Sequence, residues 1–531
     1  MVSSKRRVVA IVGGLGVVLI LLFLSRPSFE SLSNSSHVVA VTTSQRSKTS
    51  ESTTPSTTAP FVPETMMASP IPVEFPDPFA LHQPTAGEKY VTYLPHSGFH
   101  NQRIELENAF LLAAYLNRTL LLPSVFLGNP AMPWLRYNKM YERLLLQTKR
   151  GLEHCPGIPD DMPFPSECLN YFRWTSVPWT FFYDFSAIRQ RVRIIFRDDL
   201  SYEWLYDNLN ITAKQVHVMR DLSPYEFRVY DDPQSQTKLA KFVNRIELVT
   251  LEAITEPVLH FGSVFGTYRV LAQTEEHAQL LKFLRTHMIL RNPVLVDTAK
   301  RVVTKLGGVS GFVGLHVRVG DGLFKVRASI HVDDIYHQLV NTFTDLNLDH
   351  LNNTYDPNHD QDRLENSDYE VRQLRQFQPI EEPFRPLAVE HPPDIDKRLG
   401  EANNLDPALT CQTGDAVTRR FQKTVVYIAT DAPDPRNNPL LKKIFATFPC
   451  VFVLGDFKDE LEDMKRIEVV EEKIKLESYL IPMVDAIIAA QGHTFYGTKD
   501  STFSSYIERQ LHPVYTNKEV KVMRPRKKST A

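Results

Sequence analysis

The sequence predicts an α/β fold with parallel sheets, and two stretches of the 531-residue chain carry this prediction. In the first stretch, residues 90–94 are predicted to form a short strand, a loop containing Gly98 follows, and residues 120–123 form the next strand. Between the strands, apolar side chains at positions 106, 109, 110 and 113 have the spacing of one helix face. This order is typical of a βαβ unit, whose strands run parallel.

A second α/β unit is predicted in the C-terminal half. Its strands and its main helix are visible as apolar runs: 311–319, 424–430 and 451–454 for the strands, and 474–490 for the helix. We therefore predict an N-terminal domain of residues 89–305, in which Glu275–Leu290 is helical, and a C-terminal domain of residues 306–515. A polar, acidic and Pro-rich stretch, about residues 352–422, is predicted to be an insertion, and residues 516–531 form a basic tail.

The N-terminus carries a predicted membrane anchor. Residues 8–24 are an unbroken apolar run, at the short end of what crosses a bilayer core of about 30 Å. Basic residues dominate the preceding cytosolic tail, residues 1–7, and Arg26 alone follows the run closely, so the bulk of the chain is expected in the lumen. A cleaved signal peptide is the alternative, but the residues after the run offer a poor cleavage site. We expect a single-pass type II protein of the Golgi or the endoplasmic reticulum, with Ser/Thr/Pro-rich residues 25–88 as a disordered stem.

Composition and cysteines narrow the class of function. The formal net charge of −2 gives no field that would favour nucleic acid. Four cysteines form no C-x-x-C pair, which argues against zinc. In an oxidising lumen we expect two disulfides, Cys155 with Cys168 across a Pro-rich loop and Cys411 with Cys450 as the remaining pair, although other connectivities stay open.

The sharpest candidate for a site is the predicted strand that ends near Arg318. Side chains alternate along a strand, so His316 and Arg318 share one face, and the valines and leucine between 313 and 319 share the other. At the carboxyl end of the strand, both would point to the edge where open α/β sheets bind ligands. A guanidinium there suits a diphosphate, whereas the alternative is an arginine paired with a nearby carboxylate such as Asp321.

Three further loops follow predicted strands. Gly98 and Asn101 precede a helix whose amide groups suit an anion, or they are ordinary turn residues. Asp431 follows the strand at 424–430 and either accepts hydrogen bonds from a guanine edge or starts a turn before proline. In the third loop, four hydroxyl groups crowd a helix N-terminus, where they either bind phosphate or cap the helix: Ser501, Thr502, Ser504 and Ser505.

Together these segments resemble the GDP-fucose O-fucosyltransferase family. The resemblance rests on residues 97–103, 316–321, 428–431 and 501–505, which occur in the family's order and span about residues 89–512. It implies a GT-B architecture of two Rossmann-like domains facing a cleft. It also implies an inverting transfer of fucose from GDP-fucose to a hydroxyl of a protein or glycan, without a metal or other cofactor.

The resemblance also implies roles for the candidate residues. Arg318 would bind the diphosphate and stabilise the charge on departing GDP. His316 would hold the nucleoside, and Asp431 would lie near the guanine. The remaining donor-binding candidates are Gly98, Asn101, Asp321, Ser501, Thr502, Ser504 and Ser505.

The general base is where the chain departs from the family pattern. Some members carry a carboxylate at the edge of the first loop, and here that position reads Pro95-His96-Ser97. We expect His96 to take the acceptor proton, because imidazole titrates near neutral pH; Glu105 and Glu107 are close in sequence but on the following helix. The departure leaves the acceptor class open, and with it the alternative of an inactive, membrane-tethered carbohydrate-binding homologue. A related transferase that uses another nucleotide sugar on the same scaffold is a second alternative.

Overall fold

The computed structural model describes residues 69–159, 161–320, 322–344, 405–412, 421 and 423–522. All of these residues belong to one compact unit. The predicted anchor, most of the predicted stem and insertion, Asp321 and the end of the basic tail lie outside the described residues. Among the described helices, none combines the length and the apolar character needed to cross a membrane.

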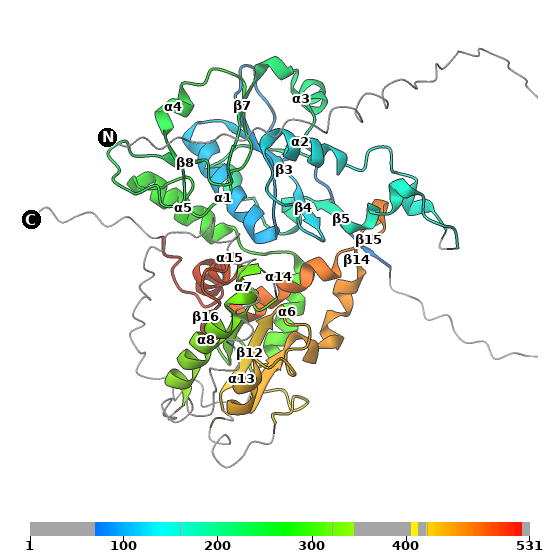
Figure 1. The fold of residues 1–531 in the computed structure, drawn as a ribbon, viewed down its shortest axis with the longest axis vertical. Helices are drawn as coiled ribbons and strands as arrows, with labels where there is room; N and C mark the ends of the chain where they lie inside the picture. Colours follow the sequence, from blue (N-terminus) through cyan, green and yellow to red (C-terminus); the bar gives the residue numbers. More distant parts are fainter. Residues whose placement is uncertain are drawn as a thin grey trace, which may run out of the picture. The chain divides into compact units, whose positions relative to one another are not determined.

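The first half of the described chain folds around a five-stranded parallel sheet (Figure 1). The strand order is β6-β3-β2-β10-β7, and every pairing is parallel. The strands are β2 (Tyr90–Tyr93), β3 (Thr119–Pro123), β6 (Ile194–Arg197), β7 (Val216–Met219) and β10 (Val258–Phe261). The helices of this half are α1 (Phe99–Tyr115), α2 (Tyr137–Leu146), α3 (Tyr202–Leu209), α4 (Leu248–Glu252) and α5 (Glu275–His287).

The predicted βαβ unit is confirmed as β2-α1-β3. Helix α1 is buried along most of its length, and Leu106, Ala109, Phe110 and Ala113 pack into the main hydrophobic core. Because β2 and β3 pair in parallel, α1 starts at the carboxyl edge of the sheet, just after the loop that contains Gly98.

The second half folds around a four-stranded parallel sheet with the order β13-β12-β11-β16. The strands are β11 (Val313–Val317), β12 (Val425–Thr430), β13 (Cys450–Val453) and β16 (Thr494–Gly497). The helices are α6 (Pro293–Lys305), α7 (Gly322–Val326), α8 (Ala328–Phe343), α13 (Lys442–Thr447), α14 (Glu477–Ala490), α15 (Thr502–Tyr506) and α16 (His512–Tyr515), with a π-helical turn (Ile507–Leu511) between the last two. The strands and the helix predicted in this half are therefore confirmed.

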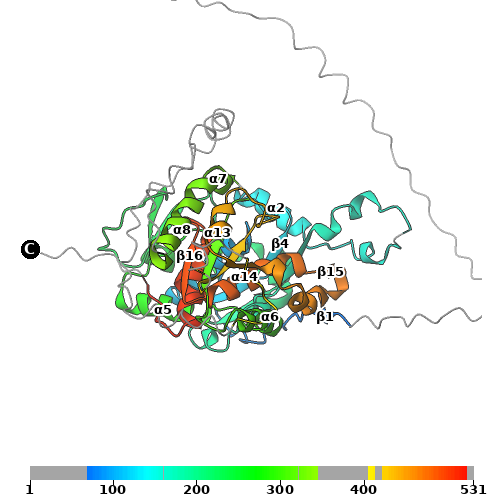
Figure 2. The same cartoon turned by 90° about the horizontal axis from the view of Figure 1, so that it is seen from below.

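The two faces of this second sheet pack against different helices. Val313, Leu315 and Val317 share a hydrophobic cluster with residues of α8 and α13, as their alternation predicts. The opposite face packs against α6 and α14, and Figure 2 shows α6 across the sheet from α8 and α13. Here α14 lies so close that a Cβ atom at Gly314 would be 2.0 Å from the carbonyl oxygen of Ala489, so this position requires glycine.

Order begins before Lys89, which differs from the sequence expectation. Strand β1 (Ile71–Pro72) pairs in parallel with β14 (Ile467–Val469), which pairs with β15 (Ile474–Lys475). Residues near the start of the described chain are therefore tied to the second half of the fold. The remaining short strands form two pairs, β4 (Val125–Gly128) with β5 (Trp174–Val177) and β8 (Phe227–Tyr230) with β9 (Asn244–Glu247).

Both expected disulfide pairs are present in the structure. Cys155 and Cys168 are bonded with their Cα atoms 5.5 Å apart, and they close a loop between β4 and β5. Cys411 is bonded to Cys450, the first residue of β13, at a Cα distance of 4.5 Å. This second bond holds the described end of the predicted insertion, residues 405–412, on the sheet.

Candidate functional site

His316 lies at the carboxyl end of β11 and points away from the apolar face. Its side chain is buried, its Nδ1 atom is 2.6 Å from the hydroxyl of Ser504, and its ring contacts Phe503 with centroids 4.3 Å apart. Burial, helped by the positive charge of Arg318, lowers the pKa of His316 to about 3. The imidazole is therefore neutral at physiological pH, and it holds the start of α15 against β11.

Arg318 is the first residue after β11 and keeps part of its side chain in solvent. The side chain is 29% exposed, and its Nε atom is 4.0 Å from the carboxylate of Asp431. The guanidinium carbon lies 4.5 Å from the ring centroid of Phe324 in α7, a cation–π contact. The Arg318 backbone N–H also donates to the hydroxyl of Thr498, which donates in turn to the carbonyl of His316. This arrangement presents a positioned positive charge at the carboxyl edge of the second sheet.

Asp431 shapes the loop that carries Arg318. Its carboxylate accepts hydrogen bonds from the backbone N–H groups of Val319 (2.7 Å) and Gly320 (3.1 Å). A Cβ atom at Gly320 would be 2.8 Å from the same carboxylate, so the approach depends on the absence of a side chain there. The predicted contact with guanine stays a prediction, and the internal role is an additional finding.

The four hydroxyl groups near α15 do not form one open cradle. Ser501 is fully buried and caps α15 by accepting a hydrogen bond from the Ser504 N–H (3.2 Å), while Ser504 is occupied by His316. Thr502 and Ser505 are half-buried, and Thr502 donates to the side-chain oxygen of Asn101 at 3.1 Å. The structure thus leaves Thr502 and Ser505 as the hydroxyls closest to solvent, and the helix-cap interpretation holds for Ser501.

The loop before α1 differs in detail from the sequence argument. Gly98 has a φ of −75°, which any residue adopts, and the left-handed conformation belongs to Ser97, with a φ of 65°. A Cβ atom at Gly98 would meet no atom within 4 Å, and the residue is exposed. Gly98 is therefore not needed for the turn, and it leaves open space beside Asn101.

His96 is in a position that does not suit a general base. The residue is 1% exposed, its Nδ1 atom lies 2.7 Å from the Ser97 hydroxyl, and its Nε2 atom lies 2.8 Å from both the Ser263 hydroxyl and a Glu105 carboxylate oxygen. An acceptor hydroxyl has no access to this imidazole, because both ring nitrogens are enclosed and partnered. The structure therefore contradicts the expectation that His96 takes the acceptor proton.

Neither carboxylate of α1 replaces His96 as a base. Glu105 is fully buried, and burial raises its pKa against the opposing effect of His96. Glu107 accepts two hydrogen bonds from Arg285 of α5, at 2.9 and 2.7 Å. Although burial raises the pKa of Glu107, the Arg285 charge prevails and lowers it. The general base is left unassigned.

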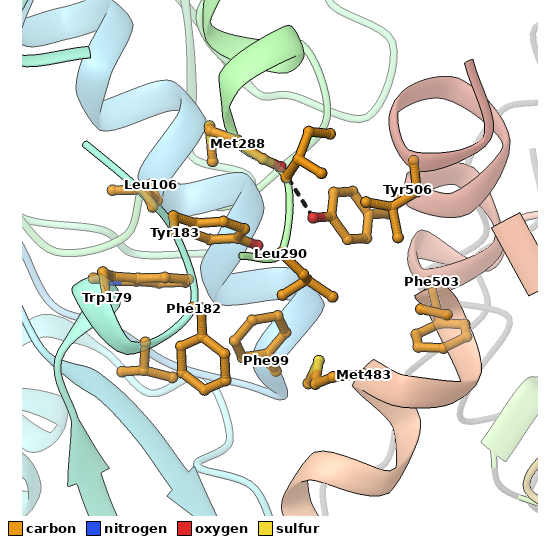
Figure 3. Close-up of a cluster of buried hydrophobic side chains, with 14 of the residues drawn as sticks. Phe99, Leu106, Trp179, Phe182, Tyr183, Met288, Leu290, Met483, Phe503 and Tyr506 are labelled. Carbon is orange, nitrogen blue, oxygen red and sulfur yellow. Dashed lines mark hydrogen bonds between the residues drawn. The ribbon is translucent and has the colours of Figure 1, made fainter. Parts of the chain in front are cut away.

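The loops 97–103 and 501–505 come together although they belong to different halves of the chain. Beyond the bond between Thr502 and Asn101, the hydroxyl of Tyr506 donates to the carbonyl of Met288 at 3.0 Å. Figure 3 shows Phe99 of α1 in the same buried cluster as Phe503 and Tyr506 of α15. One hydrophobic core therefore joins the two halves at the site.

Sequence reasoning missed two contributors to this arrangement. Thr498 lies in the same loop as the four hydroxyls, but the sequence gives no sign that its hydroxyl would link β11 to that loop. Phe324 lies outside all the motifs, and no spacing in the sequence relates it to Arg318.

A possible metal site is not supported by the cysteines. Within the described part of the chain, the group with suitable ligand spacing is His154 with Cys155 and Cys168. Both sulfur atoms are bonded to each other in the disulfide, so they are not available as thiolate ligands.

Comparisons with known proteins agree with the resemblance seen in the sequence. No family model matches the chain. A segment of 39 residues is 54% identical to O-fucosyltransferase 30 of Arabidopsis thaliana, which is 7% of this chain and 8% of the length of that relative. The chain combines an α/β fold of two parallel sheets with a polar site where loops from the carboxyl ends of both sheets meet. It is similar to proteins of the GDP-fucose protein O-fucosyltransferase family.

Solved structures give a more distant likeness. A crystal structure of POFUT1 in complex with GDP-fucose is 12% identical over 82% of this chain and 97% of that one, with a TM-score of 0.35. A POFUT1 structure in complex with GDP is 13% identical over 82% and 98% of the two chains, also with a TM-score of 0.35.

Proposed function

We propose that the chain is an O-fucosyltransferase of GT-B type, which transfers fucose with inversion from GDP-fucose to a hydroxyl group of a protein or glycan. Arg318 is the observation that carries this proposal. Its guanidinium is partly exposed and is held between Asp431 and Phe324, at the sheet edge where open α/β folds bind ligands.

The chemistry of the transfer fits such a charge. The acceptor oxygen attacks fucose C1 while the bond from C1 to the diphosphate oxygen breaks, and GDP leaves with the bonding electrons. Negative charge therefore grows on the diphosphate, where a positioned guanidinium stabilises it more in the transition state than in the ground state. The acceptor proton goes to a base that we do not assign. We propose that the parts of GDP-fucose that Arg318 does not contact lie against Thr502, Ser505 and the open space at Gly98.

A second candidate is an inactive carbohydrate-binding homologue. The observation that favours it is the burial of His96, Glu105 and Glu107, since these nearby groups are all enclosed and paired. The two candidates differ in turnover, because the homologue would bind nucleotide or sugar without releasing GDP from GDP-fucose.

Calorimetry on the protein tests the donor site. We expect GDP to bind, UDP to bind more weakly, and Arg318→Ala to weaken GDP binding about tenfold to a hundredfold, the range for hydrogen bonds to a charged group. Arg301→Ala is the matched control, because Arg301 is a comparably exposed arginine with a carboxylate partner, Asp463. Equal binding of GDP by the wild type and Arg318→Ala would refute the assignment. Transfer that a chelator abolishes would refute a metal-free reaction.

The location in the cell is a further part of the proposal. We propose a type II membrane protein of the Golgi or the endoplasmic reticulum, supported by the two disulfides, which persist in oxidising compartments. Asn117 and Asn210 begin N-x-Thr sequons and are both exposed. We expect a mass decrease on N-glycosidase treatment that is smaller in the double variant Asn117→Gln with Asn210→Gln, because the sequons at Asn34 and Asn352 remain. The same mass before and after treatment of the wild type would contradict lumenal exposure of these sites.

A further inference from the structure

His100 lies at the joint between the two halves, with its ring held by aromatic side chains. The centroid of its imidazole is 4.4 Å from Phe503 in an edge contact, 5.5 Å from Tyr506 and 5.2 Å from Phe99. Figure 3 shows these three aromatic residues, from α1 and α15, in one cluster. His100 is therefore one of the residues of α1 that reach α15, and its ring contacts Phe503, as the ring of His316 does.

The imidazole of His100 has no hydrogen-bond partner among the described residues. Both ring nitrogens are covered. Arg103, one turn further along α1 and 4% exposed, has its Nη1 atom 3.8 Å from Glu107 and its guanidinium 4.6 Å from the centre of the Tyr506 ring. Buried polar groups in folded proteins are nearly always hydrogen-bonded, since leaving them unpaired is unfavourable. Two unpartnered nitrogens on one ring point to a polar group that binds there.

The charges around His100 indicate an anion. Its pKa lies well below the usual value, because of burial and then of Arg103, His316 and Arg318. Two arginines, Arg103 from the first half of the chain and Arg318 from the second, thus act on a neutral imidazole. A neutral imidazole can still donate one N–H, and phosphate oxygens are strong acceptors.

We infer that His100 donates a hydrogen bond to the diphosphate of the donor nucleotide, from the α1 side of the site opposite Arg318. The inference rests on the proposed function, because it assumes that a nucleoside diphosphate binds at Arg318. The residue as a whole is half-buried, and a half-turn of the ring about the Cβ–Cγ bond exchanges its nitrogens with ring carbons inside the same outline. The aromatic contacts therefore do not prevent a nitrogen from reaching a ligand.

The substitution His100→Phe separates a binding role from a packing role. Phenylalanine keeps the aromatic contacts and removes both nitrogens, so we expect a melting temperature at least as high as that of the wild type. GDP binding, measured by calorimetry, should weaken about tenfold to a hundredfold, the range for a hydrogen bond to a charged group. His100→Asn keeps one N–H donor and should lose less.

His260→Phe serves as the control, because His260 is a fully buried imidazole of β10 with an unpartnered Nε2 atom. It should bind GDP like the wild type. If His100→Phe binds GDP as the wild type does while Arg318→Ala does not, the inference is wrong and the donor site stands. If His260→Phe weakens binding as much as His100→Phe, the effect is one of packing and the inference is wrong. A wild type that binds no GDP would overturn both the inference and the proposed function.

Discussion

Replacement of Asp431 by alanine separates two roles that the residue can have in donor binding. Its carboxylate accepts the N–H groups of Val319 and Gly320 at 2.7 and 3.1 Å and lies 4.0 Å from Arg318. A hydrogen bond to a charged group contributes about 1.5–3 kcal/mol when shielded. The Asp431 side chain is 38% exposed, so solvent weakens both bonds, and we take about 1–2 kcal/mol for the pair.

This free energy would be lost mainly in the loop that carries Arg318. Because the loop can open without unfolding β11, we expect only a small change in the melting temperature of Asp431→Ala. Binding of GDP requires the ordered loop, so its dissociation constant should rise about fivefold to thirtyfold. Calorimetric titration with GDP, UDP and ADP measures the change for each nucleotide.

The pattern over the three nucleotides distinguishes the two roles. A residue that organises the loop affects every nucleoside diphosphate by the same factor, whereas a guanine contact affects GDP alone. Asp434→Ala is the control, since Asp434 lies on the same loop and bonds locally to Asn437. A loss confined to GDP would refute the loop role, and unchanged affinity for all three would refute both roles.

Three further changes test other contacts of the fold and the site. Arg285→Ala leaves Glu107 buried without its main partner, so the free energy of unfolding, measured with denaturant, should fall by about 3–5 kcal/mol, and a change below about 1 kcal/mol would contradict the pairing. Phe324→Leu removes the cation–π contact with Arg318, so GDP should bind a few times more weakly while Phe324→Trp binds at least as well as wild type; equal affinities across this series would oppose the contact. Burial raises the pKa of Asp485 to about 7. The folded state therefore holds a proton that the unfolded state releases from about pH 4. Stability should fall as pH rises from about 4 to about 7, and less so in Asp485→Asn, as unfolding at several pH values would show; identical pH profiles would contradict this.

The parts of the fold that follow a periodic pattern were predictable. Apolar alternation along β11 correctly separates the face of Val313 and Leu315 from that of His316. Helix α5 was also predicted, from residues 275–290. By contrast, β6, β7 and β10 have four residues each, and an apolar pattern this short does not identify a strand by itself. The two-residue strand β1 is visible only through its pairing with β14, which lies almost 400 residues away.

The sequence predicts where the site residues lie in the fold, but it does not predict which of their side chains are exposed to solvent. The motifs correctly indicate that residues near Gly98 and residues near Ser504 lie at sheet edges, since each follows a strand. Whether a side chain is enclosed depends on distant residues, as with His96, whose Nε2 atom meets Ser263. The hydroxyl of Ser504 is a second example: the sequence motif predicts that it binds phosphate, but in the folded chain it is hydrogen-bonded to His316.

Helix α1 explains how the fold fixes the direction of the first loop. Three of its charged residues, Arg103, Glu105 and Glu107, are buried, which apolar packing alone does not explain. Each has a different partner: Arg103 stacks on Tyr506 of α15 at 4.6 Å, Glu105 meets His96, and Glu107 binds Arg285 of α5. Buried pairs of this kind add little net stability, but removing either member is costly, so they select one orientation of the helix. Rotation of α1 about its axis would break all three contacts at once, and the same rotation would turn Gly98 and Asn101 away from Thr502. The buried charged residues Arg103, Glu105 and Glu107 thus hold the first loop against α15, where the donor is proposed to bind.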